Sequence, residues 1–374
     1  MSSVLLRDHA VNRNLVAVSL FSGAGGLDLG VKNCGVRIAA AVERDPIACK
    51  TLKYNFVDAR KPEAQTTIVR DDIENVSVSE LRKKAGLSRG DVDLIVGGPP
   101  CTPFSKSGYW IEYKRAGLDP DRFLLDHYVR FVKELKPRAF IMENVHALAY
   151  DNHNRSSLDA LLESLENLGY VIDRKVLVAA EFGVPQVRQR LFILGSKLGT
   201  PSFPIETHAG SYERQNRFAN LGLKPFVTCA EAFEGLPNEV EEGEKVGGLH
   251  GHLLPEIPPG DNYLYFTKER GHAKPLFKWR GRYWTFLLKL DPNKPSSTIQ
   301  AQPGPYIGPF HWENRRLRVP ELKALMTFPQ DFRFEGNRRS VQMQLGNAVP
   351  PALAEIVAEE LIRSTFERSK KKSA

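Results

Sequence analysis

The stretch LVAVSLF (Leu15–Phe21), followed directly by SGAGGL (Ser22–Leu27), decides the fold class. The first part is an apolar, partly β-branched run that is typical of a buried strand. The second part is a glycine-rich turn, after which Gly25–Cys34 reads as the start of a helix. In an open parallel sheet, ligands bind at the carboxyl ends of strands, where glycines let the backbone approach a ligand closely. The stretch therefore predicts the first strand, ligand turn and helix of an α/β sheet.

The same alternation of apolar runs and helical segments continues to about residue 197, where a Pro- and Gly-rich region without clear periodicity begins. Strands that alternate with helices predict a mostly parallel, doubly wound sheet with helices on both faces. We expect a large domain (1–197, completed by 337–374), a smaller second domain (198–314) and a hinge segment (315–336). Further strands are predicted at 36–43, 66–69, 93–96, 139–142 and 190–195, and helices at 46–56, 78–85, 123–135, 156–168 and 352–366; regular structure of unspecified type is expected at 320–326.

The composition excludes several classes of protein. The chain has 374 residues, and 42% of them are hydrophobic, which is enough for a sizeable core. Its net charge of +8 permits a nucleic-acid partner. Four cysteines without a CxxC pair predict neither a disulfide framework nor a zinc site, and we expect His250 and His252 to be solvated. No apolar run reaches the roughly 18 residues of a membrane span.

The acidic residues near the glycine-rich turn indicate the kind of ligand. A dinucleotide site needs a third glycine where this chain has Asp28, which disfavours a pyrophosphate cradle. Glu43, at the end of the second predicted strand, can hold both hydroxyls of a ribose, and Asp72 after the third can accept from an adenine amino group. These residues fit a nucleoside ligand without a phosphate; the alternative is a tight turn with surface acids.

A second group of polar residues follows the fourth and fifth predicted strands. Cys101 comes after Gly97-Gly98-Pro99-Pro100, whose prolines fix the backbone, and Glu143 ends the next strand. A thiolate beside a carboxylate that can hold a proton is an arrangement for covalent catalysis. Strand alternation predicts Arg188 and Arg190 on one face, where they could bind a phosphate or a carbonyl group. A buried structural cysteine and ordinary salt bridges are the alternatives.

Taken in order, these segments resemble the motifs of the DNA cytosine-5 methyltransferase family over about residues 17–355. The family often has Thr and then Arg-Glu where this chain has Arg318 and then Pro320-Glu321. The resemblance rests on six motifs in the order of the family: Phe21–Gly26, Gly97–Cys101, Glu143–Val145, Gln186–Arg190, Arg316–Pro329 and Gln344–Pro350.

The resemblance implies a methyltransferase with a Rossmann-like sheet, a target-recognition domain (198–314) and S-adenosyl-L-methionine as methyl donor, with S-adenosyl-L-homocysteine as product. Cys101 would attack carbon 6 of a flipped-out cytosine, and the methyl group would pass to carbon 5. Glu143 would bind nitrogen 3 and the amino group, and Arg190 the carbonyl at position 2, with Arg188 also in the catalytic set. The implied cofactor residues are Phe21, Gly23, Gly25, Leu27, Glu43, Asp72, Ile73, Pro99 and Asn347; no metal is implied.

Two basic segments are the predicted contacts with duplex DNA. Residues 102–122 form a candidate mobile loop that carries Lys106 and Arg122. Residues 268–289 hold seven basic residues against one acid, interleaved with three aromatics, and contribute Lys278, Arg280 and Arg282. A solvated basic face is the alternative. The acidic segment 238–245 is expected to be a solvated loop.

Other readings remain open beside this one. An RNA cytosine-5 methyltransferase would share the fold, although its transfer-RNA branch has a Cys-Phe-Thr signature where this chain has Thr228-Cys229-Ala230. A catalytically inactive DNA-binding module is the alternative from a different class. Pro99-Pro100-Cys101 argues against an amino methyltransferase, and the glycine spacing argues against an NAD-dependent oxidoreductase. By analogy we expect a cytoplasmic, nucleoid-associated bacterial modification enzyme, monomeric on DNA, with a separate restriction endonuclease as its possible partner.

Overall fold

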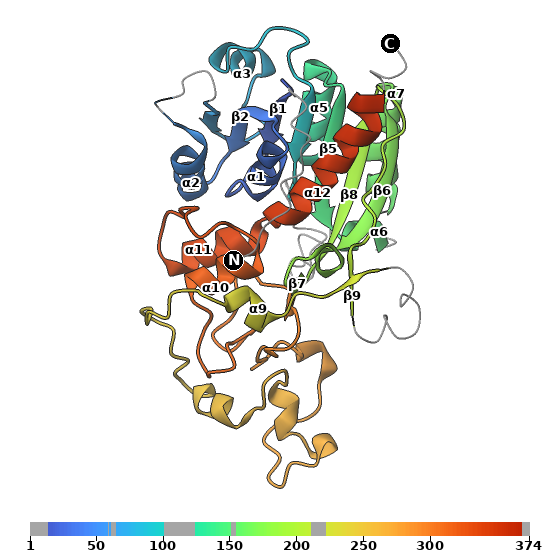
Figure 1. Ribbon diagram of the computed structural model, residues 1–374. Coiled ribbons are helices and arrows are strands. Elements are labelled where there is room, and N and C mark those ends of the chain that lie inside the picture. Colours follow the sequence, from blue (N-terminus) through green and yellow to red (C-terminus); the bar gives the residue numbers. More distant parts are fainter. Residues whose placement is uncertain are drawn as a thin grey trace. The chain divides into compact units, whose positions relative to one another are not determined.

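The computed structural model describes residues 14–58, 60, 65–100, 124–150, 155–210 and 222–368 (Figure 1). The chain divides into two units. The first consists of Met1–Leu177, Gln189–Pro204 and Leu353–Ala374, and the second of Val178–Arg188 and Ile205–Ala352. Cys101, Lys106 and Arg122 lie outside the described residues. Within the described ranges, no helix has both the length and the apolar character needed to cross a membrane.

The first unit is built on a seven-stranded sheet with the strand order β3-β2-β1-β4-β5-β8-β6. The pairs β1–β2, β2–β3, β1–β4 and β4–β5 are parallel, and β5–β8 is antiparallel, which confirms the predicted mostly parallel sheet. The strand order reverses between β1 and β4, so the carboxyl ends of these two strands border the crevice where such sheets bind ligands. The strands are β1 Val16–Leu20, β2 Arg37–Glu43, β3 Thr67–Arg70, β4 Leu94–Gly97, β5 Ala139–Val145, β6 Val171–Val178 and β8 Gln189–Ser196.

Helices follow the strands as the sequence predicts, and α3, α5 and α7 cover one face of the sheet. The strand residues Val18 and Leu20 pack in one hydrophobic cluster with Tyr128 and Phe131 of α5 and Leu165 of α7, all of them buried. The helices of this unit are α1 Gly26–Asn33, α2 Pro46–Phe56, α3 Val78–Lys84, α5 Leu124–Leu135, α6 Ala147–Tyr150 and α7 Arg155–Asn167; α12 Pro351–Ile362, which ends in a π-helical turn at Arg363–Glu367, lies mostly in it.

The second unit has short elements and a separate core around Tyr263, Phe266 and Phe310. The regular structure expected at 320–326 is the helix α10. The helix α11 was not predicted, because its polar sequence has little apolar periodicity. The elements are 3-10 helix η5 Ala179–Phe182, β7 Gln186–Val187, β9 His208–Ala209, β10 Lys224–Pro225, α9 Cys229–Phe233, 3-10 helices η7 Gly251–Glu256, η8 Tyr263–Phe266, η9 Lys268–Arg270 and η10 Gly281–Tyr283, β11 Ser296–Ser297, α10 Val319–Leu325 and α11 Arg338–Asn347.

Candidate active site

The glycine-rich turn after β1 has a backbone conformation that restricts its sequence. Phe21 and Gly23 have φ of 55°, and Gly25 has φ of 86°, all in the left-handed region. A Cβ at Gly25 would lie 2.6 Å from the ring of Phe56 on α2, so this position accepts only glycine. Leu27 is buried in the first turn of α1. The turn thus brings main chain with few side chains to the carboxyl end of β1, as predicted.

Glu43 ends β2 and is held against this turn by two main-chain donors. Its Oε2 accepts a hydrogen bond from the Gly23 N–H at 2.7 Å, and its Oε1 accepts one from the Asp45 N–H at 2.8 Å. Burial raises the pKa of Glu43, and the two hydrogen bonds offset part of that rise. Each carboxylate oxygen has a second lone pair, so the oriented group can still accept a hydroxyl of a bound ligand.

The remaining predicted cofactor residues of the first unit follow β3 and β4, at the same edge of the sheet as the glycine-rich turn. Asp72 is half-buried and lies 3.4 Å from the guanidinium of Arg44, and Ile73 is buried beside it. Pro99 is buried, and its carbonyl oxygen accepts a hydrogen bond from Asn144 Nδ2 at 3.1 Å. These contacts leave a carboxylate and two apolar side chains at the edge, which suits an adenosine-like ligand.

An ion pair between Glu143 and Arg190 lies at the end of β5. Arg190 Nε and Glu143 Oε1 are 2.8 Å apart, and their side chains are 13% and 11% exposed. The antiparallel pairing of β5 with β8 sets Arg190 opposite Val145, two residues beyond Glu143. Burial lowers the pKa of Arg190, and Glu143 offsets part of this shift. The pair presents a carboxylate and a guanidinium side by side, the two groups to which the resemblance assigned contacts with a pyrimidine ring.

Gly98 makes room for this carboxylate. A Cβ at this position would lie 2.9 Å from Glu143 Oε2, closer than real Cβ contacts allow. We expect Gly98→Ala to shift the Glu143 carboxylate and to lower kcat/KM of the enzyme's reaction by about 10- to 100-fold, because small misplacements of a reacting group are costly. Steady-state assays of that reaction would check this. Gly247→Ala is the control, since a Cβ at Gly247 meets nothing within 4 Å; equal activity of the two variants would contradict the prediction.

Three cysteines lie within the described ranges, and burial makes two of them poor nucleophiles. Burial raises the pKa of Cys49 and that of Cys229 to about 12, so both remain thiols near neutral pH. The Cys34 thiol donates to the carbonyl oxygens of Gly30 and Glu355. The cysteine predicted to be catalytic, Cys101, lies outside the described residues, one position beyond Pro100.

Known proteins are similar to this chain over most of its length. Residues 15–363 match the C-5 cytosine-specific DNA methylase family. The type II methyltransferase M.SacI of Streptomyces achromogenes is 46% identical, over 94% of this chain and 94% of its own. M.NgoFVII of Neisseria gonorrhoeae, also a type II methyltransferase, is 33% identical, over 89% of this chain and 83% of its own.

The chain belongs to the C-5 cytosine-specific DNA methylase family.

The DNA methylase fold is also that of solved structures. A candidate DNA modification methyltransferase encoded within an E. coli prophage matches with a TM-score of 0.65 at 23% identity, covering 94% of this chain and 99% of that one. This likeness confirms the predicted Rossmann-like fold class. The family and the curated relatives confirm the expectation that the chain is a DNA (cytosine-5) methyltransferase. DNA is therefore its substrate.

Arg188 of this DNA methylase is fully buried in the second unit and binds main chain. Its guanidinium donates to the carbonyl oxygens of Ile299 at 3.3 Å, Gly346 at 2.7 Å and Ala348 at 3.0 Å. Asn347, the predicted cofactor residue between two of these acceptors, ends α11 and is exposed. We therefore revise the catalytic role expected for Arg188: its hydrogen bonds are those of a residue that fixes the segment carrying Asn347.

The basic segment predicted to contact DNA contains two kinds of residue. Lys278, Arg280 and Arg282 are exposed, and the guanidinium of Arg282 lies 4.8 Å from the centre of the Tyr283 ring. Lys289 is instead buried, and its Nζ donates to the carbonyl of Ile257 at 2.7 Å among other acceptors. The expected contact segment therefore ends before Lys289, whose charge supports the core of this unit.

Two histidines, His250 and His252, were considered as metal ligands. Within the described part of the chain, no group of three or more His, Cys, Asp or Glu side chains could hold a metal ion. The half-buried ring of His250 packs edge-on against the rings of Phe277, Phe286 and Tyr306, with centroids 5.1–5.6 Å apart. His252 is exposed. His250 was expected to be solvated, and its place among aromatic rings corrects that expectation, whereas the exposure of His252 agrees with it.

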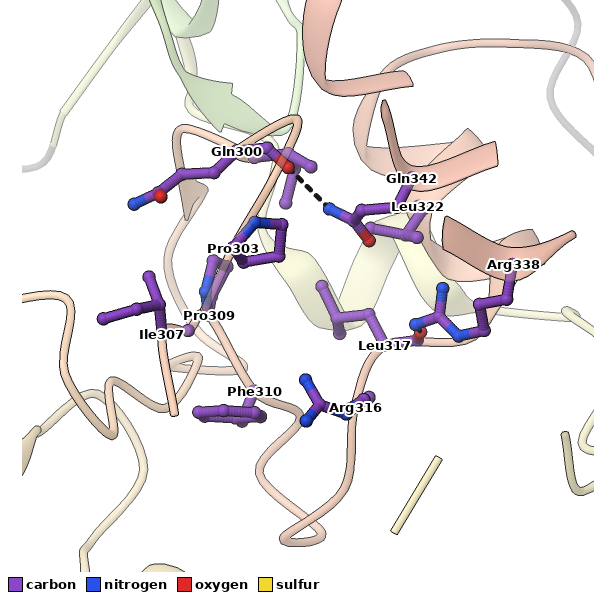
Figure 2. Close-up of a pocket in the computed structure, with 12 residues that line it drawn as sticks. Gln300, Pro303, Ile307, Pro309, Phe310, Arg316, Leu317, Leu322, Arg338 and Gln342 are labelled. Atoms are coloured by element: carbon purple, nitrogen blue, oxygen red, sulfur yellow. Dashed lines mark hydrogen bonds between the residues drawn. The ribbon is translucent and has the colours of Figure 1, made fainter. Parts of the chain in front are cut away.

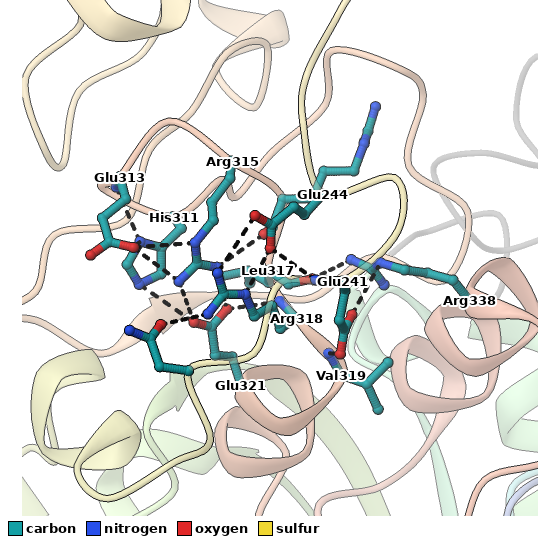
Figure 3. Close-up of polar contacts among 12 residues, drawn as sticks. Glu241, Glu244, His311, Glu313, Arg315, Leu317, Arg318, Val319, Glu321 and Arg338 are labelled. Carbon is teal, nitrogen blue, oxygen red and sulfur yellow. Dashed lines mark hydrogen bonds and ion pairs between the residues drawn. The ribbon is translucent and has the colours of Figure 1, made fainter.

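A buried ionic network surrounds the start of α10 (Figure 3). Arg315 donates two hydrogen bonds to Glu321, at 2.9 and 2.7 Å, and Glu321 also accepts from the Arg318 N–H at 2.7 Å. Arg318 Nε in turn lies 2.7 Å from Glu244. Glu241 accepts from the Val319 N–H at 2.9 Å. The acidic segment 238–245 is therefore not the fully solvated loop that its composition suggested, because the carboxylates of Glu241 and Glu244 are bound by Val319 and Arg318.

We expect Glu321→Ala to destabilise the second unit by about 2–3 kcal/mol, because it removes the helix cap of α10 and leaves the Arg315 guanidinium without its bidentate partner. Arg315 and Glu321 are 9% and 8% exposed, so water compensates little. Urea unfolding of the whole chain measures the change. Glu313→Ala is the control, because Glu313 also binds Arg315 but is 58% exposed; an equal loss in both variants would contradict the prediction.

A pocket in the second unit lies beside this network (Figure 2). Its empty volume is about 340 Å³, part of it open to solvent, and its wall includes Arg316, Phe310 and Gln342. The Arg316 guanidinium lies over the Phe310 ring and donates to the Pro305 carbonyl, and Gln342 Nε2 donates to the carbonyl of Gln300 at 2.8 Å. These two polar side chains already bind main chain, and they thereby support the loops that surround the pocket.

Proposed function

We propose that the chain transfers a methyl group from S-adenosyl-L-methionine to carbon 5 of a flipped-out cytosine within a specific duplex DNA sequence, with Cys101 as nucleophile. The observation that carries this proposal is the buried Glu143–Arg190 pair, 2.8 Å between Nε and Oε1, at the end of β5. Gly98, three residues before Cys101, lies against the Glu143 carboxylate. This contact supports the proposal that the acid and the nucleophile act at one edge of the sheet.

The chemistry requires each of these groups. Carbon 5 of cytosine is a weak nucleophile, and attack of the Cys101 thiolate on carbon 6 breaks the aromaticity of the ring and loads carbon 5 with electron density. Glu143 hydrogen-bonds nitrogen 3 and the amino group and so favours the protonated ring. Arg190 binds the carbonyl oxygen at position 2. Loss of the carbon-5 proton and elimination of Cys101 then release the product.

The edge of the sheet suits S-adenosyl-L-methionine. Phe21 can stack on the adenine, Glu43 can hold the ribose hydroxyls and Asp72 the exocyclic amine. The other proposed members of this set are Gly23, Gly25, Leu27, Ile73, Pro99 and Asn347. The fit rests on the left-handed glycine turn and on the two main-chain hydrogen bonds that orient Glu43. When bound, the cofactor supplies an electrophilic methyl group and leaves as S-adenosyl-L-homocysteine.

DNA recognition is proposed for residues 198–314, joined through the hinge segment 315–336 to the catalytic domain (1–197 and 337–374). A cytosine in a duplex is inaccessible, so the base must be flipped out at a cost of a few kcal/mol. The exposed Lys278, Arg280 and Arg282 support duplex contact in this domain. Lys106 and Arg122 are proposed to contact the phosphates around the flipped base.

The biological setting proposed is a restriction-modification system. Both relatives described above carry the name type II methyltransferase, and the chain covers most of their length. In this setting the enzyme would act as a monomer on DNA, inside the bacterial cell with the nucleoid, and a cognate restriction endonuclease would act separately on the same sequence.

The test is transfer of a labelled methyl group from S-adenosyl-L-methionine to mixed-sequence duplex DNA and, in parallel, to transfer RNA. We expect 5-methylcytosine in the DNA, none in the RNA, and no label with Cys101→Ala. Cys34→Ala, which removes a half-buried thiol elsewhere in the chain, should retain activity.

Each other outcome has a definite meaning for this proposal. Label in transfer RNA alone would assign the chain to an RNA cytosine-5 methyltransferase. Labelled DNA with Cys101→Ala would exclude Cys101 as nucleophile. If the wild-type chain binds DNA and cofactor but labels neither substrate, it is a binding module that lacks catalysis.

A further inference from the structure

The turn formed by residues 279–284 projects basic and aromatic side chains from the second unit. Trp279, Tyr283 and Trp284 are 48%, 44% and 46% exposed, although large aromatic side chains are usually buried. Between Arg270 and Leu290 the sequence contains no acidic residue. In Figure 1 this turn belongs to the part of the ribbon coloured between yellow and orange, which carries no element labels. The surface is suited to a polyanion that also offers flat apolar groups.

Tyr263, a buried residue of η8, holds the main chain of this turn at Arg280. Its hydroxyl donates to the Arg280 carbonyl oxygen at 2.7 Å and accepts from the Arg280 N–H at 3.0 Å. The Tyr263 ring is fixed by edge-on contacts with Phe277 and Phe286, 5.7 and 5.6 Å between centroids. One buried phenol therefore uses both its donor and its acceptor on a single residue of the exposed turn.

A second bond fixes the far end of the same turn. Asn262, next to Tyr263, donates from Nδ2 to the Trp284 carbonyl at 2.8 Å. Within the turn, the Tyr283 N–H donates to the Arg280 carbonyl at 2.9 Å. The main chain from Arg280 to Trp284 is thus anchored at both ends to neighbouring residues of the second unit, which gives it little freedom to move.

The side chain of Arg280 is in a different situation from the other arginines nearby. Arg270 forms an ion pair with Asp261 at 2.9 Å, and Arg282 lies over the ring of Tyr283. The guanidinium of Arg280 is exposed and has no hydrogen-bond or ion-pair partner among the described residues. An unpaired arginine on a fixed main chain is more than phosphate binding needs, because a phosphate contact tolerates a flexible tether whereas a base contact requires a defined position.

We propose that Arg280 reads one base pair of the target through a base edge with two acceptors, as guanine has in the major groove, and that Tyr263 is the positioning residue that makes this reading selective. Lys278 and Arg282 bind phosphates and contribute affinity without sequence preference. This inference rests on the proposed action on duplex DNA and identifies the residues that determine its specificity.

The experiment maps methylated cytosines in a pool of duplex oligonucleotides of randomised sequence, treated with the wild-type chain or a variant and S-adenosyl-L-methionine. Selectivity is the rate at the preferred sequence divided by the rate at sequences changed at one base pair. We expect Arg280→Lys to lower selectivity at a single guanine-containing base pair by about 10- to 100-fold. Tyr263→Phe should lower it at the same base pair, with a smaller effect, because only the anchoring hydroxyl is lost.

Matched controls separate positioning from stability and from affinity. Tyr265 lies in the same 3-10 helix, and its hydroxyl has no hydrogen-bond partner in the described ranges. Tyr265→Phe should therefore match Tyr263→Phe in thermal midpoint within a few degrees but keep wild-type selectivity. Lys278→Ala should slow methylation equally at all sequences and reduce the salt dependence of binding by about one unit of slope.

Two outcomes would overturn the inference. One is an equal loss at all sequences for Arg280→Lys, which would make Arg280 a phosphate contact. The other is unchanged selectivity in Tyr263→Phe together with a changed one in Arg280→Lys, which would remove the positioning role. If the wild-type chain methylates no duplex at all, the proposed function itself fails, and this result is distinct from both.

Discussion

Glu143→Gln is expected to lower kcat/KM for DNA methylation by about 100- to 10,000-fold, the range that a positioned acid or base contributes. Glutamine keeps the shape of the side chain but has no carboxyl proton to share with nitrogen 3 of the cytosine ring. It also removes the negative charge that faces Arg190, 2.8 Å from Nε to Oε1, in a place where both side chains are nearly buried. Initial rates with labelled cofactor measure the effect.

Arg190→Lys is the companion variant. Lysine keeps the charge but loses the planar fork that can bind a carboxylate and a carbonyl oxygen together, so we expect a loss of about 10- to 100-fold. Because the two side chains act as one unit, the double variant should be little worse than Glu143→Gln alone. Cofactor binding, measured by calorimetry, should stay within a few fold in all three. If Glu143→Gln keeps more than a tenth of wild-type activity, Glu143 is not the acid.

Local sequence signals were sufficient to predict which residues lie at the carboxyl edge of the sheet, because each motif lies at or near the end of a strand. Glu43 is the last residue of β2, Glu143 lies two residues before the end of β5, and the left-handed turn at Gly25 needs a residue without a Cβ, so the order of the motifs indicated their positions. The fold class followed for the same reason. β6 was not predicted, because its charged, largely exposed sequence lacks the apolar pattern of a buried strand.

Contacts between distant parts of the sequence could not be predicted in this way. The pairing of Arg190 with Glu143 depends on the antiparallel register of β5 and β8, which no local pattern specifies. Glu244 was expected in a solvated loop, since its partner Arg318 lies 74 residues later. Arg188 was expected to meet a ligand, but its carbonyl partners come from segments more than a hundred residues away. The numbers of basic and acidic residues predict the net charge of the chain. Which of these charged side chains remain exposed depends on their pairing in the folded structure.

Asp28→Asn is expected to stabilise the protein, and more so at high pH. Asp28 lies in the first turn of α1, is 1% exposed, and its two carboxylate oxygens have no hydrogen-bond partner in the described structure. Burial raises the pKa of Asp28 from 3.8 to about 7; the Ser19 hydroxyl opposes this rise, and the nearby charge of Glu43 adds to it. The native state therefore keeps a proton that the unfolded chain releases at lower pH.

The sign of the pH dependence follows from this difference in bound protons. Between about pH 4 and pH 7 the folded state binds more protons than the unfolded state, so the stability of the wild-type chain falls as the pH rises, by up to about 4 kcal/mol in total. Above pH 7 the penalty is constant. Asparagine removes it, so the gain from Asp28→Asn should grow by about 2–3 kcal/mol between pH 5 and pH 8. Urea unfolding at a series of pH values measures this gain.

Ser19→Ala provides the test of cause. Removing the Ser19 hydroxyl takes away a group that lowers the pKa of Asp28. In the wild-type background this variant should therefore extend the loss of stability to higher pH and increase its total, because the carboxyl becomes still harder to ionise. In the Asp28→Asn background the same substitution should cost an amount that does not depend on pH. A pH-independent gain from Asp28→Asn would mean that water reaches the carboxylate when it ionises, and that burial imposes no charge penalty on the first turn of α1.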